Sequence, residues 1–406
     1  AEAFFHLVRQ QVYARDHSAG SFYSLETETL PPVPGLLDAA AALEEALARL
    51  SDPLARLEGF LLALLDTEAD ALDSAARNRI EAAARGIERR GRLQAAGWRQ
   101  MLAGLDGETP PDFVDWFGVD RIDGRDIDVG MHRHWIDPTR PFMETVIGPA
   151  HGVLITSATL CDGTGDAEAD WLAAERRTGA VHLSEPATRI AESSPFDYAG
   201  RTLVLVVGDV NRERPDDVAA AYRELFLAAG GGGLGLFTAI SRLKAVHERI
   251  AGPLDEAGLM LLAQHVDVLD TGTLVDIFRA EENSCLLGTD AVRDGVDVPG
   301  RSLRLIVFDR VPWPRPDILH RERKRAFGGR AYDEMLTRLR LKQAFGRLVR
   351  RADDAGVFVM LDKALPTRLL GAFPAGVPVK RLGLKDAVGE TREFLRRVAG
   401  IGAARP

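Results

Sequence analysis

The sequence predicts an α/β fold in which helices flank a parallel β-sheet, preceded by an all-helical domain. Two observations support this prediction. Residues 36–105 consist almost entirely of good helix formers, whereas beyond about residue 150 short apolar runs alternate with helical stretches. Apolar runs without polar alternation are typical of strands buried on both faces, and helices between them favour a parallel sheet.

The helical domain is predicted for residues 1–106. Ala, Leu, Glu and Arg dominate its central part, and apolar residues recur at spacings of three and four, which predicts amphipathic helices. The clearest examples are Leu54, Leu57, Leu61 and Leu64. Prolines between 31 and 34 mark the entry to these helices, and Gly107 with the following prolines marks their exit.

Seven apolar runs are expected to form strands. They are residues 151–160, 202–209, 234–239, 259–264, 284–290, 303–309 and 357–362. We assign residues 166–406 to one α/β domain and residues 107–165 to the last part of another.

The composition is that of a soluble globular protein with two or three domains, since 46% of its 406 residues are hydrophobic and 27% are charged. No apolar run approaches the ~18 to 20 residues of a membrane span. The amino terminus has no signal-peptide core, so we expect a cytoplasmic protein. Cys161 and Cys285 are too few for a four-cysteine metal site. No metal site is therefore expected in this chain.

The net charge of -9 argues against indiscriminate binding of nucleic acid. However, residues 321–351 contain eleven Lys or Arg and three acids, a local charge of +8. This run could line a path for a nucleic-acid strand. A solvated helix face is the alternative.

The strongest candidate for chemistry lies in residues 343–351. On a helix, Gln343, Arg347 and Arg350 fall at spacings of four and three, which would place their polar heads on one face. Two guanidinium groups placed in this way can clamp the oxygens of a transferring phosphoryl group. The alternative is an amphipathic basic helix at the surface.

A second candidate is the loop over residues 288–300, which follows an apolar run. Its three glycines and its proline predict sharp turns. Its hydroxyl and carboxylate groups come from Thr289, Asp290, Asp294 and Asp297. Thr289 could touch a phosphodiester backbone, and Asp297 could contact a ribose or an arginine. An ordinary connection rich in turn residues is the alternative.

A third candidate is the end of the run over residues 154–160, which contains Ser157, Ala158 and Thr159. The hydroxyl groups of Ser157 and Thr159 could relay the state of a phosphate site to a neighbouring domain. A strand end that merely caps the next helix is the commoner case.

In their order along the chain, these stretches resemble motifs III to VI of superfamily 2 helicases and, more narrowly, the DinG/XPD branch. The four stretches are SATL, LGLFTAISRL, LLGTDAVRDGVDVPG and QAFGRLVRRADDAGVFVMLD. Further similar stretches are IDPTRPFMETVI, SSPFDYAGRTLVLVV and VPWPRPD. The resemblance covers about residues 130–365. It implies a second RecA-like domain over residues 166–406 and the end of a first one over residues 107–165.

The resemblance also implies a nucleotide site. Arg347 and Arg350 would be arginine fingers that reach the γ-phosphate of an ATP held by a partner domain, and Gln343 would join them. The positions expected to face the nucleotide from the preceding loop are Asp294, Gly295 and Asp297. Ser157, Ala158 and Thr159 would couple the two domains.

For single-stranded or forked DNA, the resemblance implies contacts from four residues. They are Thr238, Ser241, Thr289 and Arg293. Thr238 and Ser241 stand near the start of a helix, whose backbone N–H groups could bind a phosphate. The family often has an aromatic residue and an acid before the Gly-Val-Asp of this loop, where this chain has Val292, Arg293 and Asp294. This departure leaves the role of Arg293 open.

By position alone, residues 1–106 would correspond to the family's helical arch. The chain contains no Gly-Lys pair and therefore no Walker A loop. We expect it to be a fragment whose ATP and Mg²⁺ are bound mainly by a missing amino-terminal RecA-like domain, and to be inactive as an ATPase by itself. No iron-sulfur cluster is expected in this chain, and the resemblance leaves open whether the parent protein has one.

Two hypotheses follow from these residues. The chain is either the motor half of an ATP-dependent DNA helicase that translocates on single-stranded DNA, or a non-catalytic nucleic-acid-binding or regulatory module derived from one. Retention of Gln343, Arg347 and Arg350 favours the motor, because a binding module has no need of all three.

Overall fold

The computed structural model describes residues 1–15, 24–107, 109–122, 124–295 and 297–403; the side chains of residues 293–295 and 400–403 are outside the description. The chain forms two compact units. Unit 1 contains residues 1–138 and 315–327, and unit 2 contains residues 139–314 and 328–406. None of the helices within the described ranges is long and apolar enough to cross a membrane.

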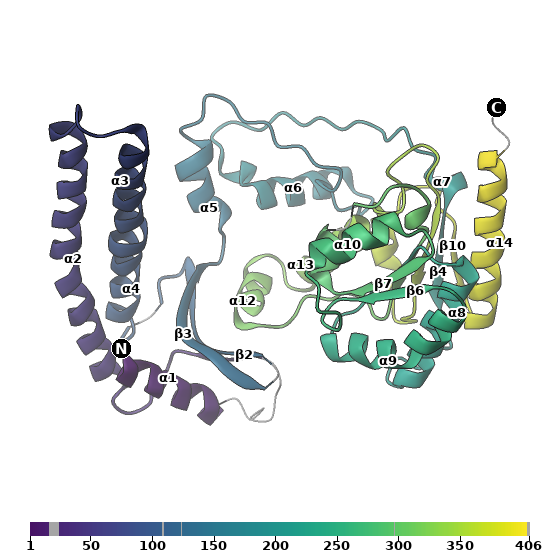
Figure 1. The fold of residues 1–406 in the computed structure, drawn as a ribbon, viewed down its shortest axis with the longest axis horizontal. Helices are drawn as coiled ribbons and strands as arrows, with labels where there is room; N and C mark the ends of the chain where they lie inside the picture. The colour runs from purple at the N-terminus through teal and green to yellow at the C-terminus, as the bar shows by residue number, and fades with distance from the viewer. Residues whose placement is uncertain (16–23, 108, 123, 296, 404–406) are drawn as a thin grey trace. The chain divides into compact units, whose positions relative to one another are not determined.

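Unit 1 combines helices with a small antiparallel sheet. Its helices are α1 (Glu2–Arg15), α2 (Leu36–Thr67), α3 (Ser74–Gly86), the π-helix η1 (Ile87–Leu93), α4 (Gln94–Ala103) and α12 (Ile318–Ala326). Its strands are β1 (Leu25–Glu28), β2 (Phe113–Ile122) and β3 (Arg125–Trp135), in the order β1-β2-β3. The predicted helices between residues 36 and 105 are confirmed, and α2 lies beside α3 and α4 (Figure 1).

Helix α12 reaches unit 1 from a distant part of the chain. Ile318 is buried with Val114 and Trp116 of β2, and its backbone N–H donates to a Glu26 carboxylate oxygen at 3.1 Å. The Arg323 guanidinium donates to the carbonyl groups of residues 135 and 136. These contacts explain why residues 315–327 belong to the compact unit of the amino-terminal helices.

Unit 2 contains a seven-stranded sheet in the order β10-β4-β9-β8-β5-β7-β6, and all the recorded strand pairs in it are parallel. The strands are β4 (Thr202–Val207), β5 (Gly233–Leu236), β6 (Met260–Ala263), β7 (Ser284–Gly288), β8 (Leu305–Phe308), β9 (Gly356–Met360) and β10 (Val379–Leu382). The predicted fold class is confirmed. Six of the seven expected strands are present, whereas β10 was not predicted.

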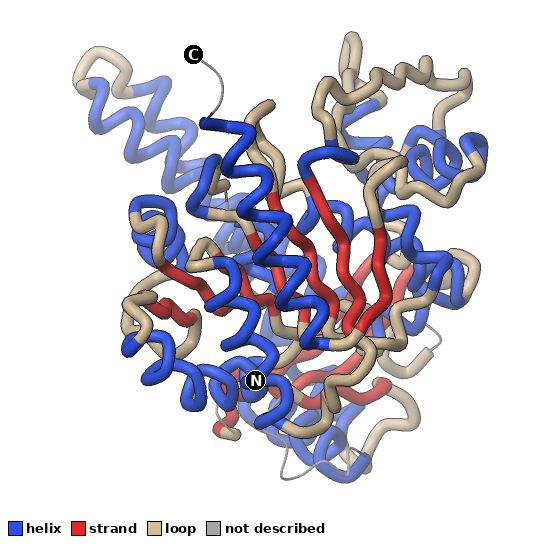
Figure 2. The backbone as a smooth tube through the Cα atoms, turned by 90° about the vertical axis from the view of Figure 1, so that its right-hand side faces the viewer, coloured by secondary structure: helices blue, strands red, loops and turns tan. Residues whose placement is uncertain are grey.

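Helices cover both faces of this sheet. The main ones are α8 (Pro215–Ala229), α9 (Ile240–Glu256), α10 (Thr271–Ala280), α13 (Arg330–Phe345) and α14 (Leu384–Ala403). Alternate residues of β4 point to opposite faces: Leu203 and Leu205 join the core under α8, α9 and α14, whereas Val204 joins the core under α10 and α13. In Figure 2, α14 lies in front of the strands and leads to the carboxyl terminus.

Shorter helices complete unit 2. They are α5 (Thr139–Phe142), the π-helix η2 (Met143–Ile147), α6 (Ala167–Thr178), α7 (Tyr198–Arg201), α11 (Asp290–Gly295) and the 3-10 helices η3 (Ala180–His182), η4 (Gly300–Ser302) and η5 (Thr367–Ala372). Between β7 and β8 the chain crosses from the carboxyl end of one strand to the amino end of the other through α11 and η4. This crossing segment matters because it includes most of the second predicted candidate loop.

The strand expected over residues 151–160 is absent, and this prediction was wrong. Residues 152–157 have no regular secondary structure, and Leu154 is 84% exposed. An apolar run becomes a strand only where another strand pairs with its backbone. Within the described residues, neither sheet includes this segment.

Candidate functional site

A buried carboxylate, Asp354, joins two of the predicted loops in unit 2. One of its oxygens accepts hydrogen bonds from the backbone N–H groups of Arg350 and Arg351, each at 2.8 Å. The other oxygen accepts from the Gly300 N–H at 3.0 Å. Asp354 is only 5% exposed. The carboxylate therefore fixes the end of residues 288–300, just before β8, to the end of residues 343–351, just before β9.

The prediction that residues 343–351 present three polar side chains on one helix face was wrong. Gln343, Arg347 and Arg350 do not share one helix, because α13 ends at Phe345. The N–H groups of Arg347 and Leu348 bond to carbonyl groups three residues earlier, which tightens the chain into a turn. Leu348 and Val349 are buried there, and Asp354 captures the next two N–H groups.

Arg350 and Asp297 nevertheless form an ion pair, which the sequence had not predicted. The Arg350 Nε lies 3.2 Å from a carboxylate oxygen of Asp297, and the two side chains are 36% and 70% exposed. Gln343 is exposed on α13, and Arg347 is half-buried in the turn. The Arg350 guanidinium is therefore held loosely at the surface, where an anion can reach it.

Three further predicted residues, Arg293, Asp294 and Gly295, belong to α11, but their side chains lie outside the described residues. Asp290 begins the same helix and is exposed. Among the residues whose side chains are described, no three His, Cys, Asp or Glu groups are arranged to hold a metal ion.

A second polar cluster lies at the carboxyl ends of β5 and β8. The backbone N–H of Thr238 donates to Asp309 at 3.3 Å, and the Arg242 Nε donates to the other oxygen of Asp309 at 2.5 Å. Asp309 is fully buried, and burial raises its pKa although the hydrogen bond from Arg242 opposes this. Another guanidinium nitrogen of Arg242 is buried without a hydrogen-bond partner among the described residues.

Thr289 occupies the neighbouring strand end, after β7. Its backbone N–H and its hydroxyl both donate to the Gln264 side-chain oxygen, at 3.0 and 2.9 Å. Thr238 and Ser241 are exposed around the start of α9, and Thr289 is half-buried. Three predicted residues thus lie at the carboxyl edge of the sheet. Asp309, Gln264 and Arg242 were not predicted, although Asp309 and Gln264 each end an expected strand.

The two polar groups lie at different ends of the strands. Thr238 and Thr289 follow β5 and β7, whereas Gly300 and Asp354 precede β8 and β9. The backbone that carries Arg350 is therefore fixed near the amino ends of β8 and β9, away from Thr238 and Thr289. Helix α11 and η4 lie in the segment that connects the two ends.

The predicted coupling residues lie in an exposed loop. The Ser157 and Thr159 hydroxyl oxygens are 3.1 Å apart, and the Thr159 N–H donates to Ser157; Ala158 lies in the turn between them. Nearby apolar side chains line a cavity of about 810 Å³. They include Val153, Leu154, Ile155, Trp171 and Ile190.

The basic run over residues 321–351 is not one surface. Residues 321–327 belong to unit 1 and the rest to unit 2. Several of its cations have structural partners: Arg321 pairs with Glu28, and Arg338 forms a buried pair with Asp162 at 2.6 Å. The hypothesis of one continuous basic path is therefore not supported.

Comparisons with known proteins find similarity to helicases. Residues 222–378 match the family model described as "Helicase C-terminal domain". The chain is 36% identical over 196 residues to "ATP-dependent helicase DinG" of Mycobacterium tuberculosis, which covers 44% of this chain and 28% of that protein. It is 31% identical over 206 residues to "ATP-dependent DNA helicase YoaA" of Escherichia coli, covering 48% and 32%.

Two further matches cover more of the chain. "3'-5' exonuclease DinG" of Bacillus subtilis is 26% identical over 284 residues, which is 66% of this chain and 29% of that protein. The solved structure titled "XPD_Helicase" covers 94% of this chain and 64% of its own, with 12% identity and a TM-score of 0.47. The matched regions thus span about a third or less of the length of these curated relatives.

Proposed function

This chain belongs to the DinG/XPD type of superfamily 2 helicases and corresponds to their carboxy-terminal portion, and we propose that it supplies the second RecA-like domain of an ATP-dependent DNA helicase that translocates on single-stranded DNA. In this proposal Arg350 and Arg347 contact the phosphates of an ATP whose triphosphate and Mg²⁺ are bound by another RecA-like domain. The absence of a Gly-Lys pair supports this division of roles.

The loose ion pair between Arg350 and Asp297 is the observation that carries the proposal. An accessible ion pair contributes little to stability, and these two side chains are accessible and come from the two loops that Asp354 fixes together. A phosphate can replace Asp297 as the partner of Arg350, because a guanidinium forms two parallel hydrogen bonds to phosphate oxygens. Catalysis of phosphoryl transfer depends on such positioned cations.

The exposed segment around Leu154 supports the need for a further domain. Its apolar side chains border a cavity, and Ser157 and Thr159 lie in the loop that follows them. We assign residues 107–165 to the end of the first RecA-like domain and residues 166–406 to the second. The helices within residues 1–106 would form the arch.

Single-stranded or forked DNA is proposed to bind at the carboxyl edge, around Thr238, Ser241 and Thr289. Exposed hydroxyl groups beside the first turn of α9, whose start has no side-chain cap, suit phosphate oxygens. Affinity should therefore fall as salt rises, with little sequence preference.

The decisive experiment compares Arg350→Ala with Arg351→Ala in the full-length parent. Arg351 is the exposed neighbour, and only its backbone N–H contacts Asp354. Loss of an arginine finger lowers turnover by roughly 10³-fold or more. We expect this loss for Arg350→Ala with DNA affinity retained, and near-normal turnover for Arg351→Ala.

Two results would contradict the proposal. Unchanged DNA-stimulated turnover in Arg350→Ala would remove the arginine-finger role and favour the non-catalytic nucleic-acid-binding module. Measurable DNA-stimulated ATP hydrolysis by the 406-residue chain alone would show that it needs no other domain to hold the triphosphate.

A further inference from the structure

We propose that the pocket between α8 and α14 is an anion site that binds the phosphate groups of a free nucleotide, separately from the Arg350 site. The pocket has a volume of about 390 Å³, which lies in the range of small-ligand sites. This inference depends only on the pocket itself, so it can fail or hold independently of the proposed motor function.

Guanidinium groups dominate the charge of this pocket. Four arginines line it, namely Arg301, Arg304, Arg392 and Arg396, against two acids, Asp353 and Asp354. Both Asp354 oxygens already accept backbone hydrogen bonds, so this carboxylate is turned to the loop rather than to an arginine. Arg301 lies 3.6 Å from a carboxylate oxygen of Glu282, so the net positive charge of the pocket comes mainly from Arg304, Arg392 and Arg396.

Arg304 forms the back of the pocket. Its guanidinium donates to the backbone carbonyl groups of Ala229, Gly230, Glu282 and Arg301. These acceptors are neutral, so they hold the cation without cancelling its charge. Burial lowers the pKa of Arg304, and the nearby Arg301 lowers it further, while Cys285 and Glu282 act in the opposite direction.

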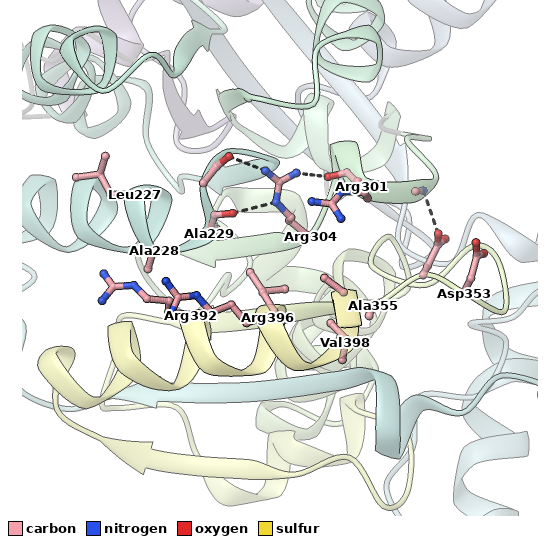
Figure 3. Close-up of a pocket in the computed structure, with 15 residues that line it drawn as sticks. Leu227, Ala228, Ala229, Arg301, Arg304, Asp353, Ala355, Arg392, Arg396 and Val398 are labelled. Atoms are coloured by element: carbon pink, nitrogen blue, oxygen red, sulfur yellow. Dashed lines mark hydrogen bonds between the residues drawn. The ribbon is translucent and has the colours of Figure 1, made fainter. Parts of the chain in front are cut away.

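Arg392 and Arg396 form the front of the pocket. They lie one helical turn apart on α14, and Figure 3 shows both side chains on the face of α14 turned toward α8 and Arg304. Both are exposed, and neither has a hydrogen bond or ion pair within the described part of the chain. Two adjacent guanidinium groups that form no ion pair can grip the oxygens of a phosphate in a bidentate manner.

Apolar side chains next to these cations favour a nucleotide over a bare ion. Leu227, Leu395 and Val398 line the same pocket. An apolar wall beside a polar grip suits a ligand that carries a flat base and a phosphate group. A continuous DNA strand would instead require an open groove that tracks the backbone.

The pocket also borders the place where Asp354 connects residues 288–300 to residues 343–351. Gly300, Asp353 and Asp354 are part of its wall, and Asp354 fixes the backbone of Arg350. A nucleotide bound here would therefore contact the segment that positions Arg350, without using the Arg350 side chain itself.

The test is calorimetric titration of the 406-residue chain with ADP at low ionic strength. We expect saturable binding of one ADP at this pocket, weakened ~10-fold or more by the double variant Arg392→Ala with Arg396→Ala. Arg397→Ala is the matched control, since Arg397 lies on the same helix over the Phe394 ring and does not line the pocket. Circular dichroism of all variants checks that the exposed substitutions preserve the fold.

Arg350→Ala separates the two possible ADP sites. Binding that survives Arg350→Ala and Arg397→Ala but is lost in the double variant supports the pocket. Absence of saturable ADP binding, or equal losses in the double variant and Arg397→Ala, would overturn the proposal. So would loss of binding in Arg350→Ala alone, or displacement of ADP by an oligo-dT strand whose own binding depends on Arg392 and Arg396.

Discussion

Replacing Asp354 by alanine should destabilise unit 2 substantially, because one buried carboxylate satisfies three backbone N–H groups. The donors are Arg350, Arg351 and Gly300, at 2.8, 2.8 and 3.0 Å. Hydrogen bonds to a charged group contribute about 1.5 to 3 kcal/mol each, but water can replace some of these at the exposed loop. We therefore expect Asp354→Ala to lower the free energy of unfolding by about 2 to 4 kcal/mol.

Urea denaturation followed by circular dichroism measures this loss, and two further variants calibrate it. Asp354→Asn keeps one carbonyl oxygen as an acceptor but loses the other, so its cost should be about half that of alanine. Asp353→Ala is the matched control, because Asp353 is exposed and no hydrogen bond from its side chain is present among the described residues. Its cost should stay within about 0.5 kcal/mol.

Hydrogen exchange provides an independent measurement. The amides of Arg350, Arg351 and Gly300 should exchange faster in Asp354→Ala than in the wild-type chain, while the amides of β9 keep their protection. The reasoning is refuted if Asp354→Ala costs no more than Asp353→Ala, or if these three amides exchange at unchanged rates.

Four other substitutions test the packing and electrostatics. Asp162→Ala should cost about 3 to 5 kcal/mol in urea denaturation, since it leaves Arg338 buried without its carboxylate. Gly235→Ala should cost about 1 to 3 kcal/mol, because a Cβ there would lie 2.7 Å from neighbouring side chains, whereas Gly252→Ala in α9 meets nothing and should stabilise slightly. Burial lowers the pKa of His134, so on acidification this imidazole takes up a proton in the unfolded state at a higher pH than in the folded state. The free energy of unfolding should therefore fall as the pH drops below 6.5. The fall should be less steep in His134→Gln, which lacks the imidazole.

The seven-stranded sheet was largely predictable because its strands are buried on both faces. Runs such as residues 203–207 are apolar at every position, and six of these runs became strands. The same signal failed at residues 151–160, since an apolar composition does not supply a neighbouring strand. It also missed β2, which is paired in a hairpin with β3.

Some residues of the candidate site were likewise predictable from the sequence, and others were not. Residues that follow a buried strand, such as Thr238 and Thr289, could be placed from the sequence alone. Asp354 could not, because its role depends on Gly300, which is 54 positions away in the chain. Asp309 likewise bonds to Thr238 across 71 positions. Local helix spacing also extended α13 too far, because the N–H groups of Arg347 and Leu348 bond three residues back and Asp354 takes the N–H groups of Arg350 and Arg351.

A substitution of Asp297 tests whether its ion pair with Arg350 stabilises the fold or leaves the Arg350 guanidinium available to a ligand. Its ion pair with Arg350 is 3.2 Å long, but both partners are solvent-accessible, and such pairs contribute about 0 to 1 kcal/mol. Asp297→Asn should therefore change the free energy of unfolding by less than about 0.5 kcal/mol, unlike Asp354→Ala. A loss of 2 kcal/mol or more in Asp297→Asn would mean that the pair fixes the fold. Arg350 would then not be available to a phosphate.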